Sequence, residues 1–318
     1  MERNKSLDAL KLVLASMVLG IHTQFCMDIS EIGTALTVHG IFRIAVPIFF
    51  LINGLYFHRV IVEGRYLQWT KRFLILYAFW MVFYSYFWLT PLEPTLAGGV
   101  QLILTVLFGY LHLWYVSGVI GAGMILFLLR KAPSSVIGIS ILITYLSGVF
   151  VQYAGAFNLF KNSALDDLFD NYWAYRNVLL FAYPFFALGF LISKHSMQDF
   201  FSTRTTIITI VLGVVFLLLE ASLNYLYTNN AGAKDSLLSL LLVCPAVFIF
   251  TIKRKTLSKG KELALYASAM YFIHVLFLNA FSKFTHIRET KLTMVLIAVS
   301  VIAAMFLVKV HKKFRFIL

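Results

Sequence analysis

Residues 40–55 read GIFRIAVPIFFLINGL, an apolar run that contains one charged side chain, Arg43. Similar runs recur along the whole chain of 318 residues, of which 60% are hydrophobic and only 13% are charged. A soluble domain carries roughly a quarter charged residues. The mean hydropathy of +0.84 is too high for a soluble protein, because one core of this size cannot bury so much apolar surface. The composition therefore indicates an integral membrane protein.

The apolar runs predict a bundle of membrane-spanning helices. A spanning helix needs about 20 mainly apolar residues, and the runs lack the alternating segments of about ten residues that a membrane β-barrel shows. A helix also satisfies its backbone hydrogen bonds internally, as lipid requires. We predict an all-α, polytopic membrane helix bundle that forms one domain over residues 1–318, with a core at about residues 5–310. About ten transmembrane helices are expected, at residues 7–28, 37–58, 72–90, 111–130, 134–153, 177–194, 205–228, 236–252, 262–282 and 292–309.

The basic residues predict the orientation of the bundle. With both termini in the cytoplasm, most of the 27 Lys and Arg residues fall at cytoplasmic helix ends, including the cluster Lys253, Lys255, Lys259 and Lys261. Cytoplasmic loops are enriched in Lys and Arg, so topology accounts for most of the net charge of +13 without a nucleic-acid partner. We expect a multi-pass protein of the inner (cytoplasmic) membrane. Lys161 falls on the outer side, and Val100–Phe108 is too short to span, so we expect this segment to be re-entrant or interfacial.

Lys11 and His22 are ionisable residues in the first predicted helix. At 100° per residue their spacing places them about 20° from a common face and about 16 Å apart along the axis. Ionisable groups inside a membrane are costly and tend to be functional, and histidine acts as a general base near neutral pH. The pair suits a ligand that is anionic at one end and reacts at the other. The alternative is that Lys11 reaches the inner surface and His22 is a packing residue.

Other ionisable residues inside predicted helices include His39, His58, Arg43, Glu220 and His274, and the last three are the most informative. Arg43 stays charged and needs a carboxylate, a water-filled cavity or an anionic ligand, unless it reaches the outer interface. Glu220, within FLLLEA at residues 216–221, is a candidate to pair with Arg43 or to orient His22, and a protonated Glu220 is equally physical. His274 lies in the middle of the ninth predicted helix, with a functional and a structural interpretation both open.

The longest predicted outer loop ends in DDLFDNYWAYR at residues 166–176. Aromatic rings stack on sugar faces and carboxylates accept hydroxyl protons, so Asp170, Trp173 and Arg176 are candidate sugar ligands. The alternative is an aromatic belt at the membrane interface. The two cysteines, Cys26 and Cys244, show no metal-ligand spacing, and no metal site is expected.

Four short motifs follow one another along the chain. They are Lys11, ten residues and His22; RIAVPIFFLING at residues 43–54; His112-Leu-Trp114-Tyr115; and Tyr271-Phe-Ile-His274. Together they resemble the acyltransferase-3 family of integral membrane acyltransferases over essentially the whole chain. Three details depart from the family pattern: Lys11 stands where Arg is common, Asn53 stands where Ser is usual, and Lys71-Arg72 does not continue as Arg-x-x-Arg.

The resemblance implies a membrane-bound O-acyltransferase of the O-acetyltransferase type. Such an enzyme takes an acyl group, usually acetyl, from cytosolic acyl-coenzyme A and places it on a hydroxyl of an outward-facing glycan or lipid-linked sugar, as in bacterial polysaccharide modification. We expect His22 as general base, with Arg43 and Glu220 also catalytic. Acetyl-CoA is a donor substrate here, not a permanently bound cofactor.

The donor and acceptor sites are assigned to separate residue sets. The chain has no GxxxxGK or GxGxxG phosphate-binding loop, so we expect the anionic nucleotide to contact the basic inner rim: Lys11, Lys71, Arg72, Arg130 and Lys131. The expected substrate-binding residues are His112, Trp114, His274, Asp170, Trp173 and Arg176.

A transporter or permease for a small solute or glycan intermediate is the alternative function. Buried charges also line solute pathways in helical bundles. Against it, the chain shows neither two matching halves nor a matched pair of Gly/Pro-broken helices. A purely structural scaffold leaves Arg43 and Glu220 unexplained. The acceptor, the length of the acyl group and the oligomeric state stay open.

Overall fold

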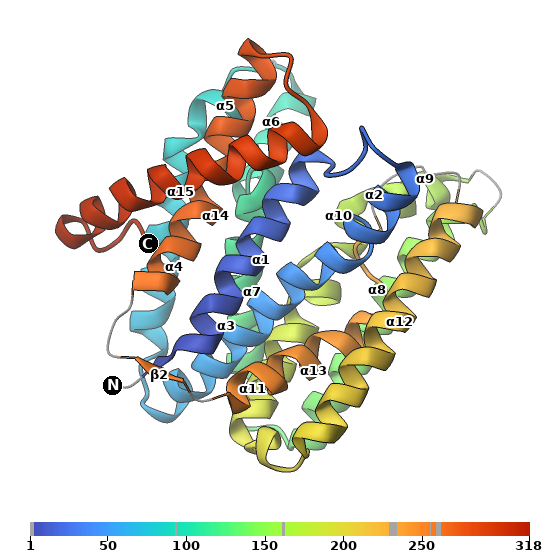
Figure 1. Cartoon of the computed structure of the whole chain (residues 1–318), viewed down its shortest axis with the longest axis vertical. Helices are drawn as coiled ribbons and strands as arrows, with labels where there is room; N and C mark the ends of the chain where they lie inside the picture. The colour runs from blue at the N-terminus through green and yellow to red at the C-terminus, as the bar shows by residue number, and fades with distance from the viewer. Residues whose placement is uncertain (1–2, 93, 161–162, 229–233, 255, 259–261) are drawn as a thin grey trace.

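The computed structural model describes the chain except for residues 1–2, 93, 161–162, 229–233, 255 and 259–261. The side chains of residues 3, 257 and 258 are also outside the described part. Of the basic residues used to predict the orientation, Lys161, Lys255, Lys259 and Lys261 therefore lie outside the described residues. Most of the described chain is helical, and its strands are one pair of two residues each (Figure 1).

The helical elements follow one another with short connections. In chain order they are α1 (Lys5–Thr23), α2 (Glu31–Thr37), η1 (Ile41–Ile44), α3 (Ala45–Val62), α4 (Tyr66–Phe83), α5 (Ser85–Leu89), α6 (Leu96–Phe108), η2 (Leu111–Leu113), α7 (Trp114–Leu129), α8 (Ser134–Ala156), α9 (Ala164–Asp170), α10 (Tyr172–Tyr175), η3 (Val178–Ala182), α11 (Tyr183–Lys194), η4 (Met197–Asp199), α12 (Thr203–Tyr227), α13 (Leu240–Lys253), α14 (Glu262–Phe284) and α15 (Glu289–Lys313). Strand β1 (Arg3–Asn4) pairs antiparallel with β2 (Leu257–Ser258).

The prediction of a polytopic helical bundle is confirmed. Seven helical stretches in the described residues are long and apolar enough to cross a membrane: 5–23, 31–62, 111–129, 134–156, 203–227, 262–284 and 289–313. Two more predicted spans correspond to the shorter apolar helices 178–194 and 240–253. The predicted span 72–90 is divided between α4 and α5. The total of ten transmembrane helices stays a prediction, because these last three segments are too short or too polar to meet the criteria for a membrane-spanning helix.

Residues 96–108 form the separate short helix α6, which ends at Gly109 with a left-handed φ of 93°. Thirteen residues rise about 20 Å, which is less than the roughly 30 Å hydrocarbon core. The segment is therefore too short to span, and its re-entrant path stays a prediction.

The second and the eighth predicted helices begin later than the sequence indicated, at Ala45 and Leu240. The predicted span 37–58 is interrupted by the 3-10 turn η1, which contains Arg43, and α3 begins only at Ala45. This start leaves Pro47 in the first turn of α3, where its missing N–H costs no hydrogen bond. The span predicted from 236 begins at Leu240 instead, because side chains of other helices bind the backbone N–H groups before it.

Close packing of α3 against α11 forms the centre of the bundle. A Cβ atom added at Gly54 would collide with the carbonyl of Phe186, and one added at Gly189 would collide with the carbonyl of Leu51. Only glycine allows the two backbones to approach this closely, as at many helix contacts in membranes. The contact fixes α3, which carries the second sequence motif.

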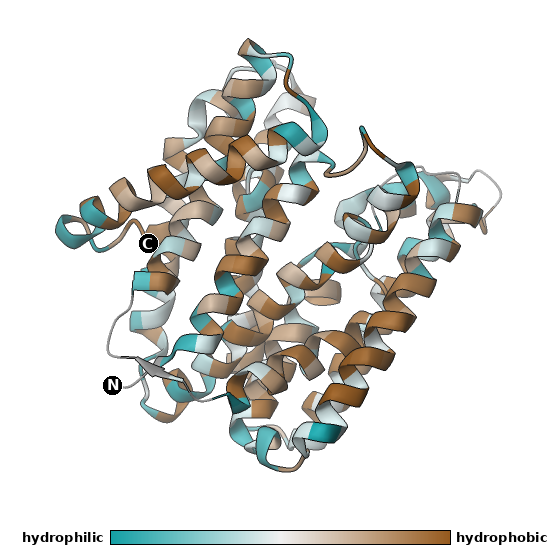
Figure 2. Ribbon diagram, in the orientation of Figure 1, coloured by the Kyte–Doolittle hydropathy of each residue, from teal (hydrophilic) through white to brown (hydrophobic). Residues whose placement is uncertain are grey.

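The outward faces of the peripheral helices are apolar. Figure 2 shows hydrophobic residues along most of α12, and Ile208, Val211 and Leu219 on this helix are all exposed. Exposed aliphatic side chains on a long helix suit contact with lipid.

The two chain ends occupy different heights in the view of Figure 1. The amino-terminus lies at the bottom, and the carboxyl-terminus lies higher on the same flank. Trp80 Nε1 of α4 donates to the Ile317 carbonyl at 3.0 Å, so the last residues pack against α4. The cytoplasmic location of both termini stays a prediction.

Candidate functional site

Three predicted site residues, His22, His112 and His274, meet in the bundle. His22 lies in the last turn of α1, His112 in η2 and His274 in the middle of α14. The His274 ring lies between the other two, with ring centroids 5.2 Å from His22 and 5.0 Å from His112. The structure therefore gathers imidazoles from three distant segments into one cluster.

The hydrogen bonds of His274 determine which of its ring nitrogens holds the proton. Nδ1 lies 2.6 Å from the carbonyl oxygen of Tyr271, and a carbonyl only accepts, so Nδ1–H is the donor. In the neutral ring Nε2 then carries a lone pair. This Nε2 is buried and has no hydrogen-bond partner in the described residues. His274 is thus oriented as a hydrogen-bond acceptor beside His22.

The turn after His22 is hydrogen-bonded to the first turns of α15. Thr23 Oγ1 and Thr293 Oγ1 share a hydrogen bond of 2.5 Å, and the Cys26 N–H donates to Thr290 Oγ1 at 2.9 Å. The Thr290 hydroxyl in turn donates to Asp28, which lowers the pKa of that carboxyl. These contacts restrain the end of α1 and so position the His22 ring.

Arg43 is paired, but its partner is Asp235 and not Glu220. Arg43 Nη1 donates to Asp235 Oδ1, and Arg176 Nη1 donates to Asp235 Oδ2 at 3.2 Å. Arg43 is 6% exposed and Asp235 is 7% exposed, whereas the Arg176 side chain is 25% exposed, so the Arg–Asp–Arg unit is buried at Arg43 and Asp235 and half-buried at Arg176. The expected pairing of Arg43 with Glu220 is wrong, because a nearer carboxylate in the segment before α13 occupies the guanidinium.

The charges of the Arg43–Asp235–Arg176 unit influence the histidine cluster electrostatically. Arg176, Arg43 and Asp235 all act electrostatically on His22. Burial alone would raise the pKa of Asp235, but the two guanidinium groups outweigh it and hold the pKa below its usual value. Asp235 is therefore ionised, and one positive charge of the three groups is left over.

Gln152 of α8 holds the backbone around Asp235. Its Oε1 accepts from the N–H groups of Asp235 at 2.8 Å and Ser236 at 2.9 Å, and its Nε2 donates to the Ser236 carbonyl at 2.9 Å. The sequence reasoning missed both Gln152 and Asp235. Gln152 gave no signal, and the only signal of Asp235 was its position just outside an apolar run.

Glu220 holds the backbone immediately before α13, which begins at Leu240. Its carboxylate accepts from the Leu238 N–H at 2.8 Å, the Ser239 N–H at 2.9 Å and the Ser239 hydroxyl at 2.6 Å. Tyr153 also donates to it at 3.1 Å. The Leu238 and Ser239 donors belong to residues just before the helix, and the carboxylate also lies near the partial positive charge of the helix start. This explains the buried Glu220 without a catalytic role.

The four sequence motifs converge through polar and aromatic contacts. Asn53 Nδ2 donates to the Tyr115 hydroxyl at 2.5 Å, and the rings of Tyr115 and Tyr271 lie 5.4 Å apart. The Tyr271 hydroxyl then donates to the His112 carbonyl at 2.7 Å. The second, third and fourth motifs thus surround the histidine cluster that the first motif completes.

Trp114 and Arg176, both predicted to bind substrate, also meet. The Arg176 guanidinium lies 5.1 Å from the Trp114 ring centre and 4.5 Å from that of Tyr172. The other two predicted sugar ligands of the loop, Asp170 and Trp173, are exposed. The structure does not bring them to the histidine cluster.

The predicted donor residues do not gather into one site. Lys11 Nζ forms an ion pair with Asp8 at 3.2 Å and lies 5.4 Å from the Tyr56 ring centre. Arg130 donates to its own helix end at the Phe127 carbonyl. Lys71, Arg72 and Lys131 are exposed. Nucleotide binding at these positions stays a prediction.

The three clustered imidazoles are suited to hydrogen bonding and proton transfer, because a neutral imidazole offers one N–H donor and one lone pair. Among the described residues, no group of three His, Cys, Asp or Glu side chains has the arrangement of a metal site.

The chain belongs to the acyltransferase-3 family: residues 4–310 match the family described as "Acyltransferase domain". It is thus a multi-pass membrane protein of an acyltransferase family.

Two curated relatives carry the names of racemases. The chain is 23% identical to an "Amino-acid racemase" of Enterococcus faecalis, over 98% of this chain and 47% of that protein. It is 24% identical to a "Serine/alanine racemase" of Enterococcus gallinarum, over 78% of this chain and 36% of that protein. The chain therefore spans less than half the length of these relatives. No solved structure matches the chain significantly.

Proposed function

We propose that the protein is a membrane O-acyltransferase that moves an acyl group, most simply acetyl, from cytosolic acyl-coenzyme A to a hydroxyl of an acceptor on the outer side of the cytoplasmic membrane. The observation that carries this proposal is the contact of the His22 and His274 rings, 5.2 Å apart, within range of the Arg43–Asp235–Arg176 charges.

His22 acts as the general base. A sugar hydroxyl is a weak nucleophile while it keeps its proton, and positioned proton removal typically accelerates such steps about 10²–10⁴-fold. His22 takes the proton while the hydroxyl oxygen bonds to the thioester carbonyl carbon. The carbon–sulfur bond then breaks, and the coenzyme A thiolate leaves and takes up a proton.

His274 orients the base. Its Nδ1–H is committed to the Tyr271 carbonyl, so the buried Nε2 lone pair is a suitable acceptor for an N–H of His22. The other nitrogen of His22 then carries a lone pair for the acceptor hydroxyl. Activated nucleophiles are generally found with a base beside them and a third group that orients the base. Here the acceptor hydroxyl, His22 and His274 take these three roles.

The Arg–Asp–Arg unit stabilises the negative charge that develops on the carbonyl oxygen. Two guanidinium groups against one carboxylate leave a single positive charge, and Arg43 Nε is buried without a hydrogen-bond partner in the described residues. Fixed donors at a developing oxyanion are worth about 10²–10³-fold in rate.

The test is transfer of label by the purified protein in lipid nanodiscs. With [¹⁴C]acetyl-coenzyme A and a panel of cell-envelope glycans, we expect labelled glycan and an equal amount of free coenzyme A thiol. Labelled protein that accumulates without acceptor would indicate an acyl-histidine relay instead of direct transfer. Absence of both thiol release and labelled product would contradict the proposal.

Transport of a small solute is the second candidate function. It is favoured by the names of the two relatives, because this chain matches less than half of each of two proteins named for acting on amino acids. Counterflow of L-serine or L-alanine by proteoliposomes, with no thiol release from acetyl-coenzyme A, would select transport.

A further inference from the structure

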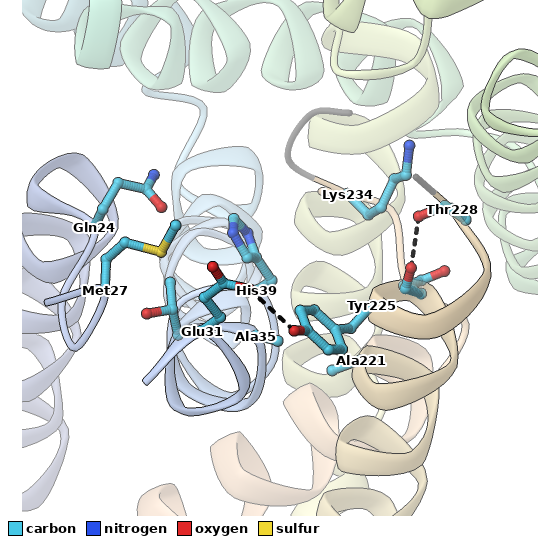
Figure 3. Close-up of a pocket in the computed structure, with 11 residues that line it drawn as sticks. Gln24, Met27, Glu31, Ala35, His39, Ala221, Tyr225, Thr228 and Lys234 are labelled. Carbon is cyan, nitrogen blue, oxygen red and sulfur yellow. Dashed lines mark hydrogen bonds between the residues drawn. The ribbon is translucent and has the colours of Figure 1, made fainter. Parts of the chain in front are cut away.

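A pocket of about 340 Å³ lies where the turn after α1, helix α2 and the end of α12 meet. Figure 3 shows Met27, Glu31 and His39 on one side of it and Tyr225 and Thr228 on the other. Sites for small molecules begin at about 300 Å³, so one small ligand fits. With the predicted orientation, the pocket opens to the outer side.

The pocket adjoins the proposed catalytic centre through two links. Gln24, which lines it, follows His22 by two residues. His39, which also lines it, accepts a hydrogen bond from Arg43 Nη2 at its Nδ1, at 3.1 Å. A ligand in the pocket would therefore lie next to the Arg–Asp–Arg unit.

The pocket walls offer both hydrogen-bond donors and acceptors. Because His39 Nδ1 accepts from Arg43, the neutral ring keeps its proton on Nε2, which is a donor. Asn224 uses its Nδ2 on the Tyr153 hydroxyl at 3.0 Å, so its Oδ1 remains an acceptor. The Glu31 carboxylate accepts one bond, from Tyr225 at 3.2 Å, and has further lone pairs.

Lys234 supplies a half-buried ammonium group to the same pocket. Burial lowers the pKa of Lys234, against the opposing charge of Asp170. Lys234 forms no ion pair within the described part of the chain. A partly desolvated ammonium that has no direct ion pair among the described residues keeps N–H donors for the oxygen atoms of a ligand.

We propose that this pocket binds the acceptor of the acyl group through one sugar ring. The inference rests on the proposed function and adds the place and chemistry of acceptor binding. Each sugar hydroxyl both donates and accepts hydrogen bonds. The hydroxyls of a single ring therefore accept from His39 and Lys234 and donate to Glu31 and Asn224. A free amino acid also offers a carboxylate to Lys234 and His39 and an ammonium to Glu31 and Asn224, so a zwitterion is the competing occupant that the test must separate from a sugar.

The test measures ligand binding directly, without acyl transfer. Equilibrium binding of radiolabelled N-acetylglucosamine and glucose, with L-serine as the zwitterionic probe, is measured on the purified full chain in nanodiscs. We expect saturable binding of at least one sugar and none of L-serine. Saturable binding of L-serine alone, or of no probe up to its solubility limit, would overturn the proposal.

Two variants locate the binding. Met27 is 47% exposed at the rim, so Met27→Trp fills the pocket without entering the core, and Lys234→Met removes the ammonium. We expect each to weaken sugar binding about tenfold or more, equivalent to about 1.4 kcal/mol. The matched controls, Met294→Trp and Lys283→Met, change exposed residues outside the pocket and should bind as the wild type does.

The two proposals fail in different ways. A wild-type protein that releases no thiol from acetyl-coenzyme A contradicts the acyltransferase mechanism, whatever it binds. A protein that releases thiol, but whose sugar affinity is unchanged in both Met27→Trp and Lys234→Met, contradicts only the pocket assignment.

Discussion

The rings of His22 and His274 lie 5.2 Å apart between their centroids, although one belongs to the first helix and the other to α14, near the end of the chain. The tautomer of His274 is determined by the Tyr271 carbonyl, whereas His22 is only half-buried. The geometry thus distinguishes a ring available to substrate from one that supports it, and substitution of each ring should have a different effect.

His22→Ala should reduce acyl transfer about 10²–10⁴-fold, because the positioned base is lost, while the protein stays folded and binds acyl-coenzyme A. His274→Ala should reduce it less, since the base remains and only its orientation is lost. Thiol release from acetyl-coenzyme A measures both rates, and exposed His286 provides the control His286→Ala. If His22→Ala kept near-normal turnover and His274→Ala had no measurable turnover, the base would lie on α14.

Arg43→Lys should lose most of the activity. The Arg43 guanidinium donates to Asp235 with one nitrogen and to His39 with another, and a single ammonium cannot reproduce this planar fork. Turnover at saturating donor is the measurement, with the thermal midpoint recorded to exclude unfolding. Full turnover would mean that only the charge at this position matters.

Asp235→Asn should destabilise the fold by about 3–5 kcal/mol, because the buried guanidinium of Arg43 and the half-buried one of Arg176 lose their shared counter-ion. The double variant Asp235→Asn/Arg176→Gln should regain part of this loss, since one of the two positive charges is also removed. Thermal unfolding in detergent measures all three proteins. Equal midpoints for the wild type and Asp235→Asn would show that the guanidinium groups are solvated.

The stabilisation of the fold by Asp235 should depend on pH only under acidic conditions. Its folded-state pKa lies below the ordinary 3.8, so its stabilising effect is complete well above that value and is lost as the pH falls through the folded pKa. The difference in midpoint between the wild type and Asp235→Asn should therefore be constant from about pH 6 to 8 and shrink below about pH 4. A difference that changes across neutrality would point to another group.

Glu220→Gln should lower stability and leave the chemistry largely intact. The carboxylate accepts hydrogen bonds from Leu238 and Ser239 just before α13, and removing the charged partner of buried hydrogen bonds typically costs about 1–3 kcal/mol. The thermal midpoint and the turnover of the folded fraction are compared. A stable Glu220→Gln protein with abolished turnover would support the catalytic role that the sequence predicts for this residue.

Gly189→Ala should strongly destabilise the bundle, whereas Gly138→Ala should be tolerated. A Cβ at Gly189 collides with the Leu51 carbonyl of α3, but one at Gly138 meets no atom within 4 Å. Both glycines lie inside helices, so the pair separates packing from helix propensity. Equal thermal midpoints for the two variants would contradict the close α3–α11 contact.

The sequence by itself determined the class of protein, its helical architecture and the motifs of the site. Apolar runs such as residues 205–228 specify a helix locally, because lipid leaves the backbone no other hydrogen-bond partners. The motifs around His22, Arg43, His112 and His274 were also readable, since each spans twelve residues of chain or fewer.

Tertiary structure alone decided the partners of the buried charges. Arg43 and Asp235 are 192 residues apart. Helical periodicity relates residues within one helix, so it cannot predict that Arg43 will meet a carboxylate in a distant irregular segment. The same holds for Glu220, whose bonds to Leu238 and Ser239 move the start of α13 away from the edge of its apolar run. A buried charge is satisfied by whichever opposite group folding brings within hydrogen-bond distance, and that distance is a property of the packed bundle, not of the order of residues.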